Sequence, residues 1–175
     1  STEIISSLGA PSVSITDTIQ NFCFSDSLGS ATVTPSGGTA PFTYLWNDPQ
    51  AQSDSTATGL AAGTFTVTVT GDGNCQAVIS ISITEPLQLD LSSSSTNLFC
   101  FGDSSGSATV STTDGTPPYA FLWSDALAQT TSTVTGLSSG IFTVTVTDNN
   151  GCADSASETI TEPPVLAMVI SDTAD

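Results

Sequence analysis

The 175-residue sequence contains no lysine, no arginine and no histidine, while 17 aspartates and glutamates give it a formal net charge of −17. Without cationic side chains the chain has no positively charged surface to bind nucleic-acid phosphates or anionic lipid head groups. Without histidine it has no Ser-His-Asp or Cys-His pair and no imidazole metal ligand, and without lysine it has no Schiff base and no P-loop. We therefore expect no nucleic-acid partner, no cofactor and no enzyme activity.

Two further absences narrow the class of protein. No run of about 18 apolar residues is present, so we expect no membrane insertion. No signal peptide with a basic n-region is present, so we expect either a mature chain or a segment of a longer one. Because 38% of the residues are apolar, the chain is not an acidic disordered tail. Its many serines and threonines, with 23 glycines and prolines, predict an all-β protein.

The sequence repeats itself with a period of 77 residues and no insertions, which is the signature of a tandem array. Matching residues at this interval are Cys23 and Cys100, Trp46 and Trp123, Gly59 and Gly136, Cys75 and Cys152, and Glu85 and Glu162. Both copies end on ITEP, and a unit of 77 residues is long enough to bury a small core of its own. The acidic residues divide between the copies, so the charge is a property of the repeat.

Each repeat shows the pattern of about seven short strands. In the first copy, residues 64–70 (TFTVTVT) and 78–84 (VISISIT) alternate strictly, so one side of each strand faces a core. Further strands are expected at 12–19, 29–34 and 42–47, with weaker ones around 51–58, and turn sequences separate them. Short strands separated by turns in this way predict an immunoglobulin-like (Ig-like) β-sandwich in each repeat.

The repeats do not coincide with the ends of the chain. We expect one repeat over residues 11–86 and a second over 87–163. Residues 1–10 then correspond to the last strand of a preceding unit, and residues 164–175 to the first strand of a following one. Either the chain is a window of a longer array, or these segments complete neighbouring subunits by β-augmentation.

The four cysteines, two in each repeat, are predicted to form disulfides. None lies in a CxxC pair, and without histidine a zinc site is not expected. If the two cysteines of a repeat lie at the same end of the sandwich, they pair as Cys23–Cys75 and Cys100–Cys152. Small β units without helices need such cross-links, and disulfides indicate an oxidising compartment outside the cytoplasm. The alternative is four reduced thiols.

Trp46 and Trp123 follow aromatic-rich stretches, PFTYLW and PPYAFLW. They are predicted to pack between the two sheets as core residues. The functional alternative is an exposed platform that stacks against sugars, as in a carbohydrate-binding module of a secreted protein.

The weak metal candidates are acidic residues in turns. Asp72 and Asp148 lie in corresponding turns beside asparagines, and Asp26 and Asp103 lie close to a cysteine. Such oxygen ligands suit Ca²⁺. Asp and Asn next to Gly are also ordinary hairpin residues, and no DxDxDG loop is present. Calcium is therefore a candidate ligand only, and no metal site or catalytic carboxylate pair is assigned.

The sequence also offers candidate O-glycosylation sites. The pattern Asp-[Ser/Thr]-[small or aliphatic] resembles the O-glycosylation sequon of some gliding and gut bacteria. The candidate acceptors are Thr18, Ser27, Ser55, Ser155 and Thr173. The alternative is that these residues are plain β-formers.

Taken in order, the motifs resemble those of the SprB repeat, found in very large secreted surface proteins of gliding bacteria. They are FC-x-[GS]DS-x-GSATV, a G-T-x-P turn, [YF]LW, TGL-x-x-G-x-FTVTVT and ITEP, in both copies. The first copy departs from the pattern at residues 71–75 (GDGNC), where the second has DNNGC. The Trp46 strand is also similar to that of PKD-type surface domains.

The resemblance implies extracellular modules strung into a cell-surface stalk, adhesin or filament, linked to gliding motility, and no catalytic residue. The expected partners are other copies, adjacent repeats or a surface polysaccharide. A filament subunit whose terminal strands complete its neighbours is an alternative.

Overall fold

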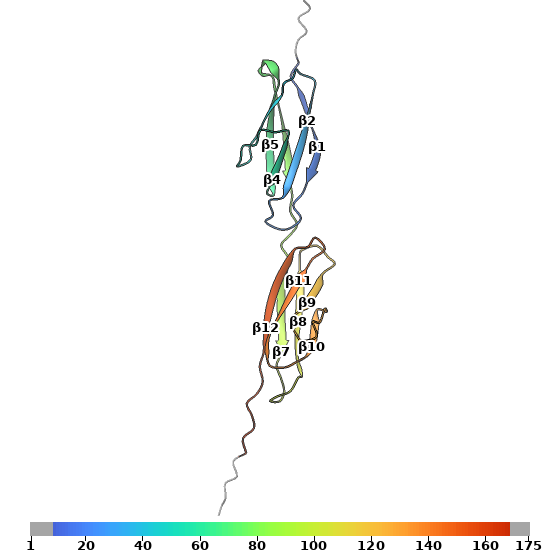
Figure 1. Ribbon diagram of the computed structural model, residues 1–175, viewed down its shortest axis with the longest axis vertical. Coiled ribbons are helices and arrows are strands. Elements are labelled where there is room, and N and C mark those ends of the chain that lie inside the picture. Colours follow the sequence, from blue (N-terminus) through green and yellow to red (C-terminus); the bar gives the residue numbers. More distant parts are fainter. Residues whose placement is uncertain (1–8, 169–175) are drawn as a thin grey trace, which may run out of the picture. The chain divides into compact units, whose positions relative to one another are not determined.

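The computed structural model describes residues 9–168 of the chain. It divides into two compact units, one ending at Leu87 and the other beginning at Gln88. Both are all-β, as Figure 1 shows, and the described residues contain only one short 3₁₀ turn, η1 (Asp72–Asn74). No helix within residues 9–168 has the length and apolar character needed to cross a membrane.

The first unit is a sandwich of two antiparallel three-stranded sheets, in the orders β1-β2-β4 and β3-β5-β6. Its strands are β1 (Ser12–Ile19), β2 (Gly29–Ser36), β3 (Thr43–Trp46), β4 (Thr56–Leu60), β5 (Gly63–Thr70) and β6 (Gln76–Ile83). β5 and β6 pair along their full length, from Gly63 opposite Ile83 to Thr70 opposite Gln76. The predicted alternating strands are the ones that form this long hairpin.

The second unit has the same topology, with sheet orders β10-β8-β7 and β12-β11-β9. Its strands are β7 (Asp90–Thr96), β8 (Gly106–Thr113), β9 (Ala120–Trp123), β10 (Thr133–Leu137), β11 (Gly140–Thr147) and β12 (Ala153–Ile160). Again the last two strands form the longest hairpin, from Gly140 opposite Ile160 to Thr147 opposite Ala153.

This strand order is that of an immunoglobulin-like sandwich that lacks the fourth strand of the seven. The expected fold class is therefore confirmed, but the expected number of strands is wrong, because each repeat has six. The stretch from Asn47 to Ser55 forms no strand. Its backbone groups are instead held by side chains of the same loop, described below.

Each unit has its own apolar core, built from the inward residues of both sheets. In the first unit the core contains Ala31, Val33, Trp46, Ala57, Leu60, Val67, Val69, Ile81 and Ile83. In the second it contains Leu89, Leu98, Ala108, Val110, Trp123, Val134, Leu137, Val144, Val146 and Ile160. Val67 and Val69 are fully buried and alternate with threonines, as the period-two pattern predicts.

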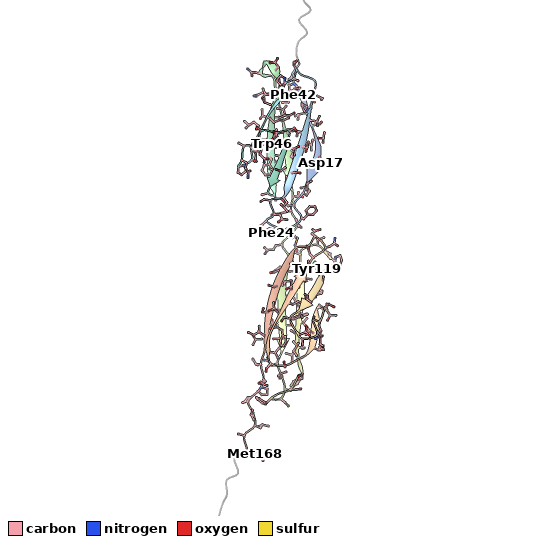
Figure 2. All side chains as sticks on the ribbon, viewed as in Figure 1. Asp17, Phe24, Phe42, Trp46, Tyr119 and Met168 are labelled. Atoms are coloured by element: carbon pink, nitrogen blue, oxygen red, sulfur yellow. The ribbon has the colours of Figure 1, made fainter. Side chains whose placement is uncertain are left out.

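The chain enters and leaves the first sandwich at opposite ends. At the end where β1 begins, Gly38 packs on Pro11, and the amide of Asp72 donates to the carbonyl of Thr39. We call this end the entry pole. At the end where β6 finishes, the amide of Asn21 donates to the carbonyl of Thr84 and Gly29 packs against Leu60 and Ile83. We call this end the exit pole. Figure 2 shows Phe42 toward the entry pole and Phe24 at the exit pole.

The second unit has the same two poles, since the amide of Asn149 donates to Thr116 at one end and that of Leu98 to Thr161 at the other. The expected neighbour strands at residues 1–10 and 164–175 lie partly outside the described residues. Within the described part, residues 9–10 and 164–168 form no strand.

Candidate functional site

Trp46 and Trp123 lie at the centre of the two cores, as Figure 2 shows for Trp46. Their side chains are 1% and 2% exposed. Each indole N–H donates to a backbone carbonyl, that of Asp54 at 2.9 Å and that of Thr131 at 2.9 Å. The alternative of a sugar-stacking platform at these tryptophans is therefore wrong, because no face of either ring is open to a ligand.

A hydrogen-bonded loop that the sequence interpretation missed supports each tryptophan. In the first repeat, Asp48 accepts from the backbone amides of Gln50 (3.2 Å) and Gln52 (2.9 Å) and from the Gln52 side chain (2.9 Å). The Gln52 side chain also bonds the carbonyl and amide of Thr58 on β4. The amide of Trp46 donates to the Gln52 carbonyl, so the loop joins β3 to β4.

The second repeat builds the same loop with Asp125 and Gln129. Asp125 accepts from the amides of Leu127 and Gln129, and the Gln129 side chain bridges Asp125 to the carbonyl of Thr135. Burial raises the pKa of Asp125, but the bonds from Gln129 and Leu127 outweigh it and hold the pKa below its usual value. The balance is the same for the pKa of Asp48. The signal in the sequence was the shared spacing WxDxxxQ.

The exit pole carries the first cysteine of each repeat on a short loop flanked by two phenylalanines. In the first repeat Asp26 accepts from the amide of Cys23 at 3.0 Å, and Glu85 of ITEP accepts from the amide of Ser25 at 2.7 Å. In the second repeat Glu162 accepts from the amide of Gly102 at 3.0 Å. The repeated ITEP glutamate therefore ties the cysteine loop to the segment by which the chain leaves the sandwich.

At the same pole, Asp103 accepts from the amide of Ser104 at 2.6 Å. The hydroxyl of Ser105 and this amide hold the pKa of Asp103 below its usual value. The carboxylates of Asp26 and Asp103, both named as calcium candidates, thus accept hydrogen bonds from their own loops.

The entry pole carries the other pair of candidate ligands. Asp148 is buried and accepts from the amides of Thr116 (3.0 Å), Asn150 (2.9 Å) and Cys152 (2.9 Å). Asp72 is exposed and accepts a hydrogen bond from the amide of Gly73 beside it. Within residues 9–168 no three or more Cys, Asp or Glu side chains gather as a metal site would require. The Asp148 carboxylate is a turn-forming group rather than an open ligand.

The cysteines do not pair within a repeat. Cys23 and Cys152 are disulfide-bonded, whereas Cys100 is a free cysteine. The predicted pairs Cys23–Cys75 and Cys100–Cys152 are therefore wrong. The physical reason is distance: Cys75 directly precedes β6, and the Cys23 loop lies at the far end of that strand, which has eight residues. At about 3.3 Å per residue the two positions are separated by roughly 26 Å, whereas bridged Cα atoms lie within about 7 Å.

The candidate glycosylation sites that the structure describes differ in exposure. Thr18, Ser27 and Ser155 are exposed, Ser55 is half-buried, and Thr173 lies outside the described residues. Thr18 is on the edge strand β1 and Ser155 on the edge strand β12, so both are reachable from solvent. Their modification stays a prediction.

An apolar groove lies at the exit pole of the second repeat. It has a volume of about 510 Å³ and is lined by Phe99, Cys100, Phe101, Pro163, Pro164 and Leu166. Phe99 is 77% exposed and Phe101 57% exposed, and Cys100 is exposed between them. Large aromatic side chains at a strand end, open to solvent, are typical of an interaction surface.

Several solved structures are similar to the chain at low identity. A structure explaining Dscam isoform specificity shares 10% identity over 89% of this chain, with a TM-score of 0.37, and this chain spans only 46% of its length. A structure of DIP-gamma IG1+IG2 shares 10% identity, covering 86% of this chain and 97% of that one, with a TM-score of 0.38. The amphioxus IgVJ-C2 molecule shares 11% identity, covering 88% and 97%, with a TM-score of 0.34.

The search of curated proteins found no match to this sequence. A family model does match, and it does so twice at the repeat interval. The model describes the SprB repeat, and its matches cover residues 15–51 and 92–128. Each match runs from β1 or β7 through the buried tryptophan to the WxDxxxQ loop. The expected resemblance is confirmed: the SprB-repeat model matches one segment in each Ig-like unit.

Proposed function

We propose that the chain is a non-catalytic structural segment of an extracellular stalk, adhesin or filament. The observation that carries the proposal is the position of the chain ends in each sandwich. In each sandwich the chain enters at one pole and leaves at the opposite pole, which is what an end-to-end array of repeats requires. A domain with both ends at one pole would instead hang from the chain as a side branch.

Three further features support this role. The described residues of each repeat form a hydrogen-bonded loop and a packed core, and Asp48, Asp125 and Asp148 accept hydrogen bonds within turns and loops. The SprB repeat is the family that matches both units. A disulfide is present, and such bonds persist in oxidising compartments outside the cytoplasm. An association with gliding motility and a glycosylated surface belong to the same proposal.

Small-angle X-ray scattering of the purified chain tests the linear arrangement. A compact fold of 175 residues has a radius of gyration of about 16 Å. We expect a clearly larger radius of gyration and a cross-section of a single sandwich. A tandem duplication of the chain should double the maximum dimension while leaving the cross-section unchanged. A radius near 16 Å, or a cross-section that grows on duplication, would refute the linear stalk.

A further inference from the structure

One outer face of each sandwich carries no charge, although the chain has a net charge of −17. In the first repeat this is the outer face of the sheet β3-β5-β6. Val67 and Val69 of β5 point into the core, so the residues that alternate with them point outward, and all of these from Thr64 to Thr70 are threonine. Their partners on β6 are Gln76, Val78, Ser80 and Ser82. We call this surface the neutral face of the repeat.

The second repeat has the same neutral face on the sheet β12-β11-β9. Opposite alternate residues of β11, the outward residues of β12 are Ala153, Ser155, Ser157 and Thr159. The two acidic residues of β12, Asp154 and Glu158, are on the inner side, opposite Val146 and Phe142. None of the outward residues of these six described strands is an aspartate or a glutamate.

The outer faces of the opposite sheets do carry charge. Asp17 on β1 is exposed opposite the outward Thr32, and Asp90 on β7 is exposed opposite the outward Thr113. Two copies that approach through these sheets bring carboxylates together, whereas two copies that approach through neutral faces do not. Because the chain has no lysine, arginine or histidine, its side chains offer no ion pair to offset the repulsion.

Exposed aliphatic side chains lie at the same place on both neutral faces. Leu45 of β3 is 58% exposed, and its counterpart Leu122 of β9 is 54% exposed. In the first repeat Leu45, Thr68 and Val78 form one row across the three strands, and Val78 is also exposed. In the second repeat a hollow of about 180 Å³ opens beside Leu122. The neutral face therefore offers apolar contact, and its small hydroxyl side chains let a second sheet approach closely.

We propose that chains associate laterally, the neutral face of one copy packing against the neutral face of a second copy. This contact extends the proposed stalk from a single chain to a bundle. With strands about 4.8 Å apart and about 3.3 Å per residue, two eight-residue strands and one four-residue strand cover roughly 300 Å². A pair of faces then buries about 600 Å², less than the roughly 1,200 Å² of a stable interface. A single contact is consequently weak, and firm association needs several contacts along each stalk.

The proposed contact has a distinctive salt dependence. Repulsion between copies acts over the Debye length, which is about 30 Å at about 0.01 M salt and about 3 Å at about 1 M. Salt therefore strengthens contact between neutral faces, whereas it weakens contact made by ion pairs. Sedimentation velocity over a series of protein concentrations measures the difference. We expect the natural chain to be monomeric at the lower salt concentration, and to show an average mass that rises above 17.7 kDa with protein concentration at the higher one.

Two double variants of equal net charge locate the contact. Leu45→Glu with Leu122→Glu adds a carboxylate to each neutral face and should weaken the high-salt association about tenfold or more, because the contact would bury unpaired charges. Thr34→Glu with Ser111→Glu adds the same two charges to the opposite sheets, at exposed outward positions, and should leave the association within about twofold of the natural chain. Leu45→Ala with Leu122→Ala removes only apolar contact and should weaken association less than the glutamates do.

Several results would overturn the proposal. A natural chain that stays monomeric at high salt, or that associates more strongly as salt is lowered, excludes contact between neutral faces. Equal weakening by both glutamate pairs would assign the effect to net charge instead of a face. Retention of a monomeric natural chain on a neutral polysaccharide column, lost only in the leucine variants, would assign the face to a sugar ligand. Each of these outcomes leaves the proposed linear stalk intact, because that role depends on the dimensions of the single chain.

Discussion

Asn21 of the first repeat and Leu98 of the second occupy equivalent positions at the exit pole, but they close that pole by different contacts. Asn21 is buried, accepts from the amides of Leu28 and Gly29 and donates to the carbonyl of Leu60. Leu98 is a core residue that packs against Gly106. One repeat closes its exit pole with a polar network, and the other closes it with apolar contact.

Two other positions differ in the same manner. Gly71 is buried beside Thr39 and Phe42, so a side chain there would be crowded, whereas its counterpart Asp148 bonds three backbone amides. Ile81 is a core residue of the first repeat. Its counterpart Glu158 instead accepts from two serine hydroxyls of β7, those of Ser93 at 2.6 Å and Ser95 at 2.7 Å.

The shared elements explain why these exchanges are tolerated. Both repeats keep the buried tryptophan, the WxDxxxQ loop and the ITEP glutamate bond. The comparison therefore separates positions that define the fold from positions that can be filled by either polar or apolar groups. Because each repeat has one tryptophan, ¹⁹F NMR of 5-fluorotryptophan protein reports the unfolding of the two repeats separately.

The largest effect is expected from truncating a core tryptophan. Trp123→Ala should destabilise the second repeat by about 3–5 kcal/mol, the usual cost of such a cavity, and leave the Trp46 signal of the first repeat folded. Because this variant lacks the tryptophan signal of the second repeat, the unfolding of that repeat is followed by far-UV circular dichroism. The matched control is Leu122→Ala, since Leu122 is the outward neighbour on β9 and is 54% exposed. If the folded Trp46 signal were lost at the denaturant concentration at which the second repeat of this variant unfolds, the two repeats would not unfold independently.

A smaller effect is expected at the entry-pole turn. Asp148→Ala leaves three backbone amides without their acceptor, so we expect a loss of about 2–3 kcal/mol from the second repeat in urea unfolding. Asp72→Ala is the control in the first repeat, where the carboxylate is exposed, and should cost less than about 0.5 kcal/mol. Equal losses of stability in Asp148→Ala and Asp72→Ala would contradict the conclusion that the carboxylate stabilises the turn of the second repeat but not that of the first.

Exchanging the residues at the exit pole sharpens the comparison further. Asn21→Leu introduces the side chain of the second repeat but removes the acceptor of two amides, so we expect the first repeat to lose about 1–2 kcal/mol. The Trp46 resonance under increasing urea measures this. An unchanged urea midpoint of the first repeat would mean that the surrounding loop, rather than the side chain at residue 21, determines whether polar or apolar contacts close the exit pole.

The smallest effect is a difference in pH dependence. Hydrogen bonds from Ser93 and Ser95 hold the pKa of Glu158 below its ordinary value of 4.5. A lowered folded pKa stabilises the protein above the unfolded pKa, and this stability is lost as the pH falls through the folded pKa. Glu158→Gln should therefore remove about 1 kcal/mol from the second repeat at neutral pH and flatten its acid dependence below pH 4.5.

The first repeat is the internal control for that experiment, because Ile81 does not titrate. The stability of the first repeat should be the same in the natural chain and in Glu158→Gln at every pH. A variant whose second repeat keeps the acid dependence of the natural chain would show that Glu158 is not its source.

The strands were predictable because they carry a local pattern. The alternation of valine with threonine in β5 and β11 identifies both the strand and its buried face. The tryptophans were predictable as core residues for a similar reason, since each ends an aromatic-rich strand. The WxDxxxQ loop was missed because its residues are polar and its hydrogen bonds join positions four and six residues apart, without any periodicity.

The cysteine pairing failed for a reason of topology. Which pole a turn occupies depends on how many times the chain reverses before reaching it. The loop after Trp46 crosses to the other sheet, and β4 then ends at the exit pole beside Gly29. Consequently β5 returns to the entry pole, and Cys75 lies there, away from Cys23. No local pattern in the sequence records such a crossing.

The opposite poles also determine how each repeat responds to force. Tension transmitted through the chain acts on the start of β1 and the end of β6, at the two ends of the sandwich. The load then runs along the strands, while the bonds that join β1 to β2 and β5 to β6 lie across them. Many hydrogen bonds are loaded together in shear instead of being opened one after another, so a repeat with this geometry resists stretching as a unit.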